Sequence, residues 1–166
     1  MLSSRLAPVA ACLLSACVTC STAEGATLDV FGKYTYVSYS YAGKPEKIVI
    51  DVPGRTLVYP GTYNVLAVCP VDSPNVCFES DRLDFCVPKL PAIPESWTCN
   101  DRRFERLGTE QVSALGVLMD AEVIRSEGVV YYFNFNDGLV GFKFVGHSPL
   151  TQFFISTTRT GFGATP

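Results

Sequence analysis

Charged residues are scarce in this 166-residue chain: Asp, Glu, Lys and Arg make up 17% of it, and the formal net charge is −3. A protein that binds phosphate backbones presents excess positive charge, so nucleic acid is not an expected partner. Anionic membrane surfaces are disfavoured for the same reason. The chain also lacks the glycine-rich fingerprints that cradle phosphates or dinucleotides. These absences remove nucleic-acid binding and nucleotide-dependent chemistry from the expected functions.

The apolar run near the N-terminus is too short to cross a membrane. It occupies residues 6–14, and even when extended to Cys20 it covers 15 residues and includes Pro8, whereas a spanning helix needs about 20. Arg5 precedes the run and small residues follow it through Ala23, which is the three-part pattern of a secretory signal. The sequence therefore predicts an exported protein, in the periplasm, at an outer membrane or secreted, whose residues 1–23 are a signal segment.

Two cleavage sites compete within this segment. Small residues before Ala23 suit ordinary signal peptidase, and cleavage there leaves an even number of cysteines. Residues 14–17 (Leu-Ser-Ala-Cys) resemble a bacterial lipobox, which would make residues 1–16 the signal and Cys17 a lipidated N-terminus. The even cysteine count favours the soluble product, and the position of the lipobox favours the anchored one. Both products stay open, and a membrane enters the prediction only through such an anchor.

Four cysteines remain after cleavage at Ala23, and we expect them to form structural disulfides. Four cysteines allow three pairings, of which we favour the one that closes two short loops, Cys69–Cys77 and Cys86–Cys99. The intervals of seven, eight and twelve residues lack the closely spaced pairs of a zinc site, and export leads to an oxidising compartment. We therefore expect no metal and no other cofactor.

The rest of the chain predicts a single mainly β domain over residues 24–160, stapled by the disulfides. Phe, Tyr and Trp make up 12% of the chain, and these side chains suit a pleated, half-buried surface. Short alternating segments separated by Pro-Gly turns are typical of an antiparallel sandwich or a small barrel-like sheet. Residues 109–119 predict one short helix, because Thr109 can cap it and apolar residues share one helical face. Residues 161–166 are expected to fray.

The clearest local signal is a hairpin over residues 129–145. Asp137-Gly138 favours a two-residue type I′ turn, and counting outward from it gives the register. One face of the hairpin is then apolar and the other largely polar, as in a sheet packed on a single side. The expected pairs are Phe135 with Val140, Phe133 with Phe142, and Tyr131 with Phe144.

Few residues suggest chemistry. His147 is the single histidine and lies in a predicted loop, where solvation is the expected role. Glu79, Asp81 and Asp84 form the densest acidic cluster, which suits either a solvated edge or a carboxylate pair for glycoside chemistry. A run of tyrosines could form an aromatic platform for a sugar or a protein. The candidate binding surface consists of Tyr34, Tyr36, Tyr39 and Tyr41.

These observations predict where the protein is located and how it folds, but they do not predict a specific activity. We expect an exported, non-catalytic module that binds or supports an unknown protein or glycan partner in the cell envelope. The alternative is a small secreted hydrolase that uses acidic residues, since a single histidine removes most other mechanisms.

Overall fold

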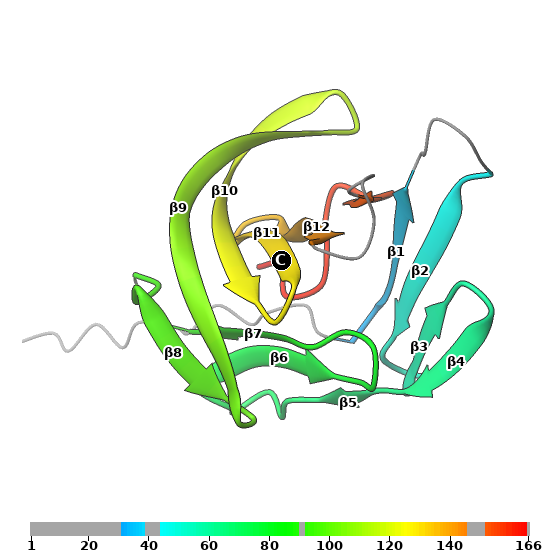
Figure 1. Cartoon of the computed structure of the whole chain (residues 1–166), viewed down its shortest axis with the longest axis horizontal. Helices are drawn as coiled ribbons and strands as arrows, with labels where there is room; N and C mark the ends of the chain where they lie inside the picture. The colour runs from blue at the N-terminus through cyan, green and yellow to red at the C-terminus, as the bar shows by residue number, and fades with distance from the viewer. Residues whose placement is uncertain (1–30, 39–43, 90–91, 146–151, 166) are drawn as a thin grey trace, which may run out of the picture.

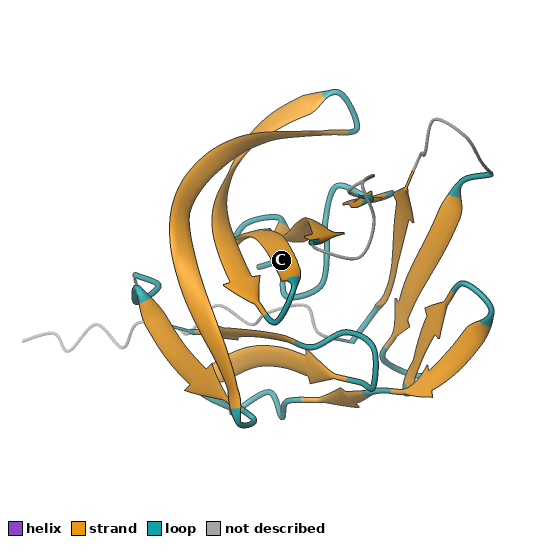
Figure 2. Ribbon diagram, viewed as in Figure 1, coloured by secondary structure: helices purple, strands orange, loops and turns teal. Residues whose placement is uncertain are grey.

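The computed structural model describes residues 31–38, 44–89, 92–145 and 152–165, and in these residues the regular structure is all β-strand (Figure 2). No helix long and apolar enough to span a bilayer occurs in this part of the chain. The strands are β1 (Lys33–Ser38), β2 (Glu46–Asp51), β3 (Thr56–Tyr59), β4 (Thr62–Val65), β5 (Ala67–Val68), β6 (Asn75–Glu79), β7 (Phe85–Pro88), β8 (Ser96–Cys99), β9 (Arg102–Ala114), β10 (Val117–Ser126), β11 (Val129–Asn134), β12 (Gly138–Phe144) and β13 (Phe153–Ser156).

The strands form two antiparallel sheets. Ten of them pair in the order β4-β3-β2-β1-β13-β12-β11-β10-β9-β8, and β5, β6 and β7 form the second sheet. The large sheet is open, with β4 and β8 at its edges, and it curls around while the small sheet lies across its lower side (Figure 1). The expected mainly β, antiparallel, sandwich-like architecture is confirmed.

The main core fills the space between the two sheets. Alternate residues of β1 point into it, so that Tyr34, Tyr36 and Ser38 are buried while the residues between them are partly exposed. Phe78 and Phe85 enter from the small sheet. Their rings meet Phe162, whose centroid lies 5.1 Å from that of Phe78. This aromatic packing joins strands that lie far apart in the sequence.

A second apolar cluster lies on the opposite face of the large sheet. It gathers Val112 and Met119 from the β9–β10 hairpin with Val130, Tyr132 and Val140 from β11 and β12. The expectation that one face of the 129–145 hairpin would be polar and exposed is therefore wrong. Tyr132 is buried and its ring packs edge-on against Phe153, with centroids 5.2 Å apart.

The predicted helix over residues 109–119 is also wrong. These residues belong to β9 and β10, which are joined by a two-residue turn with positive φ at Leu115 (53°) and Gly116 (77°). Val112 and Met119 lie directly opposite each other in this hairpin. A separation of seven residues places two side chains on one helical face, but here it also places them on one side of the sheet. Pairing along two long strands overrides the local helical preference.

The hairpin between β11 and β12 forms, with a register that differs from the prediction. Phe133 lies opposite Leu139 and Tyr131 lies opposite Phe142, and a bulge between Tyr132 and Phe133 separates the two pairs. The turn is longer than two residues: Asn134 pairs with Gly138, and the Asn134 side chain accepts a 2.6 Å hydrogen bond from the Asp137 backbone N–H. This side-chain bond competes with the type I′ geometry.

The C-terminal residues pack against the domain instead of fraying. Phe162 and Ala164 are buried, and the backbone N–H of Leu139 donates to the Phe162 carbonyl at 2.9 Å. Gly138 lacks a side chain where the tail crosses it: a Cβ there would lie 2.5 Å from the Gly161 carbonyl oxygen. The expectation of a frayed segment over residues 161–166 is therefore wrong for residues 161–165.

Two disulfides involve the small sheet: one joins the end of β5 to β6, and the other joins β7 to β8 of the large sheet. Cys69 pairs with Cys77 across a Cα separation of 5.3 Å, and Cys86 pairs with Cys99 across 6.4 Å. This is the pairing hypothesised from the sequence. Because Cys77 and Cys86 are opposite each other in the β6–β7 ladder, the two bridges lie side by side.

Candidate binding site

The two described residues of the tyrosine run do not lie on an exposed surface. Tyr34 and Tyr36 are 3% and 0% exposed, whereas Tyr39 and Tyr41 lie outside the described residues. The Tyr36 hydroxyl donates to the Leu139 carbonyl at 3.0 Å and accepts from the Phe162 backbone N–H at 3.3 Å. Burial raises the pKa of the Tyr36 phenol far above its ordinary value of 10.0. The phenols of Tyr34 and Tyr36 are core groups, and the period-2 pattern that suggested an exposed platform reflects alternation toward the interior.

A different surface presents apolar side chains to solvent. A groove of about 850 Å³ lies between the β2–β3 turn and the segment that runs from the end of β4 through β5 to Val71. Two of the side chains that line the groove are largely exposed to solvent: Phe31 is 64% exposed and Val65 is 81% exposed. The residues that line the groove are Phe31, Val52, Pro53, Arg55, Val65, Leu66, Ala67, Val68, Cys69, Pro70 and Val71.

The groove arises where the chain passes from one sheet to the other. Leu66, between β4 and β5, is buried, and its backbone N–H donates to the Arg55 carbonyl at 3.0 Å. The Cys69–Cys77 disulfide then fixes the end of β5 to β6. The segment from Leu66 to Cys69 is therefore held at both ends, by this hydrogen bond and by the disulfide. Val65 is exposed directly beside it.

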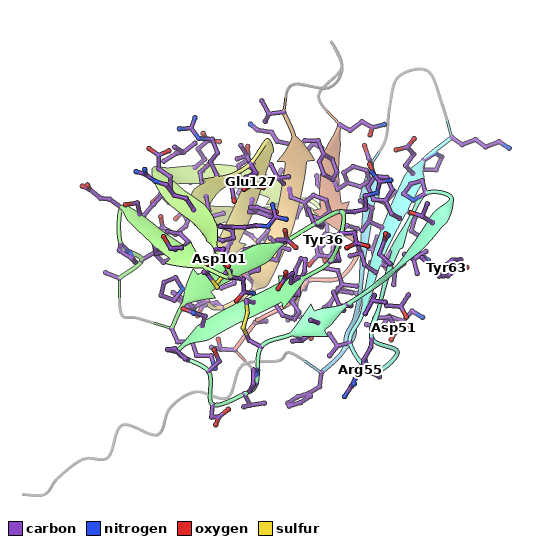
Figure 3. The ribbon with its side chains drawn as sticks, turned by 60° about the horizontal axis from the view of Figure 1, so that its bottom comes forward. Tyr36, Asp51, Arg55, Tyr63, Asp101 and Glu127 are labelled. Carbon is purple, nitrogen blue, oxygen red and sulfur yellow. A yellow bond between two sulfur atoms is a disulfide. The ribbon has the colours of Figure 1, made fainter. Side chains whose placement is uncertain are left out.

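The edge of the large sheet continues this apolar surface. Tyr63 is 81% exposed on β4, and it projects from the molecule at the same end as Arg55 and Asp51 (Figure 3). The backbone N–H of Leu66 donates to the Arg55 carbonyl, so alternate residues of β4 form the backbone hydrogen bonds to β3. The residues between them, Tyr63 and Val65, direct their backbone N–H and C=O groups away from β3, toward the open edge of the sheet. An unpaired edge with exposed apolar side chains is the kind of edge that proteins usually protect with charge.

Among the described residues, Arg55 is the one charged side chain that lines the groove. It occupies a tight turn at φ 50°, and its N–H donates to the Val52 carbonyl at 3.1 Å. The Asp51 carboxylate holds this turn by accepting from the Gly54 N–H at 2.9 Å. Hydrogen bonds from Lys33 and Gly54 keep the pKa of Asp51 below its usual value. Arg55 forms no ion pair with any described residue, so its charge is available to a ligand.

The acidic cluster is dispersed by the fold. Glu79 accepts a 3.1 Å hydrogen bond from the Asn100 amide, while Asp84 forms an ion pair with Arg102 and accepts from the Ser80 N–H at 2.8 Å. Asp81 and Asp84 line a cavity of about 80 Å³ that Glu79 does not reach. The Asp84 carboxylate is therefore already engaged by an arginine and a backbone amide, and the structure does not assemble the three acids into one site.

The sulfur atoms of Cys77, Cys86 and Cys99 lie within 4.8 Å of one another. All three belong to the two disulfides, so none is a thiolate that could bind a metal. Their proximity follows from the pairing of β6 with β7. His147, the remaining residue considered for chemistry, lies outside the described residues.

No protein-family model, no curated protein and no solved structure matches this chain. The groove must therefore be judged from its own geometry. Sequence reasoning missed it, although one signal was available: residues 56–71 contain no charged side chain. In a chain with an exposed strand edge, such an uncharged stretch indicates either a buried segment or a binding surface, and β4 is not buried.

Proposed function

We propose that this chain is an exported, non-catalytic binding module whose working surface is the apolar groove beside β4 and β5. The observation that carries the proposal is the exposure of Phe31, Val65 and Val71 around one concave site. Soluble proteins rarely leave contiguous apolar surface open to water unless it binds something. Of the two partner classes expected from the sequence, a protein fits this surface better than a glycan, because one charged group and few polar groups line it.

Export is part of the same proposal. Two disulfides are consistent with an oxidising compartment, and the tripartite N-terminal sequence supplies a route to it. The intact mass of the native protein tests this step. We expect a chain that has lost residues 1–23, or one that begins at a lipidated Cys17, with both disulfides formed. A native chain that retains Met1 and carries reduced cysteines would overturn the proposal of export.

The groove itself is tested with anilinonaphthalene sulfonate, a fluorescent probe that joins an apolar ring system to an anionic group. We expect saturable enhancement of its fluorescence by the native protein and at least about a tenfold loss of affinity in Val65→Asp, because the substitution places a charge in an apolar wall. Thr62→Asp is the matched control, since it adds the same charge to β4 at an exposed residue that does not line the groove. Equal binding to all three proteins would refute the groove as the site.

A further inference from the structure

A second exposed apolar surface lies at the turn of the β9–β10 hairpin. Leu115, Val117 and Leu118 are 59%, 54% and 67% exposed, and we call these three side chains the hairpin tip. The tip is at the end of a long arm that curls over the molecule, on the side opposite β4 and β5 (Figure 1). It is convex where the groove is concave.

The charges beside the two surfaces are opposite in sign. Residues 107–121 contain two charged side chains, Glu110 and Asp120. Both are exposed and neither forms an ion pair with a described residue. Of the described residues that line the groove, Arg55 is the charged one, and it forms no ion pair with another described residue. Opposite charges at the rims of a knob and a groove steer the two surfaces together.

The backbone at the tip is held in an unfavourable conformation for its sequence. Leu115 has a φ of 53°, in the left-handed region that the Cβ of a leucine disfavours. Asn or Gly would relieve that cost at an exposed turn. Strained residues of this kind cluster at sites of binding, and here the strained residue is also an exposed leucine.

We propose that the hairpin tip of one copy of this chain occupies the groove of a second copy, so that the chain associates with itself head to tail. This inference rests on the proposed function, because it names the occupant of the same groove. The arrangement covers both apolar surfaces with one contact and brings Glu110 or Asp120, which lie on opposite faces of the hairpin, toward Arg55. Since the two surfaces differ, the contact is heterologous, and each added copy leaves one tip and one groove free for the next.

Two blocked variants test the pairing. Leu118→Asp places a charge in the hairpin tip and leaves the groove unchanged. Val65→Asp places a charge in the groove and leaves the tip unchanged. In sedimentation velocity, native protein should gain mass with concentration, and each variant alone should remain monomeric. An equimolar mixture of the two variants should form a 1:1 dimer that grows no further, because its single intact tip and single intact groove are both used. Thr98→Asp, at an exposed position of β8, and Thr62→Asp are the matched controls and should associate like the native protein.

Charge exchange gives a second readout. Arg55→Glu should weaken native association by at least about tenfold, because it places a carboxylate opposite the acidic side chain beside the tip. Mixing Arg55→Glu with a Glu110→Lys/Asp120→Lys variant should restore association between the reversed groove and the reversed tip. Failure of that mixture to associate more tightly than Arg55→Glu alone would contradict the contact between Arg55 and the tip.

The outcomes separate this inference from the proposed function. A native protein that stays monomeric at every concentration, or a variant mixture that stays monomeric, overturns the head-to-tail contact. If Leu118→Asp still binds anilinonaphthalene sulfonate in that case, the groove stands as a binding site for another occupant. If Leu118→Asp does not bind the dye, and Val65→Asp binds it no more weakly than Leu118→Asp does, both proposals fail.

Discussion

Tyr36 and Tyr131 bury their phenol rings, and each hydroxyl meets a backbone carbonyl. Tyr36 donates to Leu139 at 3.0 Å, and Tyr131 donates to Asp84. Burial raises the pKa of both phenols well above 10.0. These two side chains pin distant strands together, since Tyr36 lies on β1 and Leu139 on β12.

The raised pKa values predict a loss of stability at alkaline pH. The folded pKa exceeds the unfolded one, so the stabilisation is complete below about pH 10 and declines as the unfolded chain ionises above it. We expect the free energy of unfolding to fall by about 1.4 kcal/mol per pH unit for each tyrosine above pH 10, measured by urea denaturation between pH 8 and 11. A Tyr36→Phe/Tyr131→Phe variant should show a shallower slope, and Tyr63→Phe, at an exposed position, should not. An unchanged slope in the double variant would contradict this reading.

Phe162 is the other residue on which the core depends. It is 0% exposed and its ring contacts the rings of Tyr34, Phe78 and Phe85. Phe162→Ala should lower the free energy of unfolding by about 3–5 kcal/mol, because it removes an aromatic side chain from the centre of the packing. Urea titration measures the change, with Thr160→Ala as the exposed control. A loss below about 1 kcal/mol would show that the C-terminal segment is not part of the core.

At the scale of the elements, the β9–β10 hairpin shows where sequence reasoning is weakest. Residues 109–119 satisfy a helical pattern, but they pair with each other in the β9–β10 hairpin. The strands of this hairpin continue into segments that pair with β11 and β8, and local propensity does not register such long-range pairing. The 129–145 hairpin could be located from Asp137-Gly138. Its register could not, because the bulge and the docking of residues 161–165 depend on contacts distant in sequence.

A substitution in the hairpin tip should increase the stability of the fold and weaken self-association at the same time. Leu115→Asn should raise the free energy of unfolding by about 1 kcal/mol, since Asn tolerates the left-handed region better than Leu. Thermal unfolding measures the gain. The same variant should associate less tightly than the native protein, because it loses an apolar side chain from the tip. A variant that is less stable than the native protein would mean that Leu115 packs in a way its 59% exposure does not indicate.

At the scale of the whole molecule, the disulfides and the groove are coupled. Cys69 lines the groove, and its bridge to Cys77 fixes β5, whereas the Cys86–Cys99 bridge joins β7 to β8. The cysteine pairing could be predicted because it follows from short loop lengths. The groove could not, because it exists only where the β2–β3 turn meets the crossing to the second sheet. The expected exposure of Tyr34 and Tyr36 was wrong, because alternation gives the period of a strand but not which face lies inside.

This coupling predicts different effects for the two disulfides. Cys69→Ser/Cys77→Ser and Cys86→Ser/Cys99→Ser should each lower the free energy of unfolding by roughly 2–3 kcal/mol, because each closes a short loop. Only the first variant should also weaken binding of anilinonaphthalene sulfonate. Urea denaturation and dye titration on the same samples make the comparison. Equal binding by both variants would show that the first disulfide does not shape the groove.

The most direct test of the account is an amide NMR titration of the Leu118→Asp variant with anilinonaphthalene sulfonate, because this variant keeps the groove and lacks an intact tip. We predict that the amides that shift upon binding are those of Phe31, Arg55, Val65, Leu66 and Val71, with little change around the acidic cavity of Asp81 and Asp84. Shifts centred on that cavity, or no saturable shifts at the groove, would contradict the claim that the groove is the working surface of this protein.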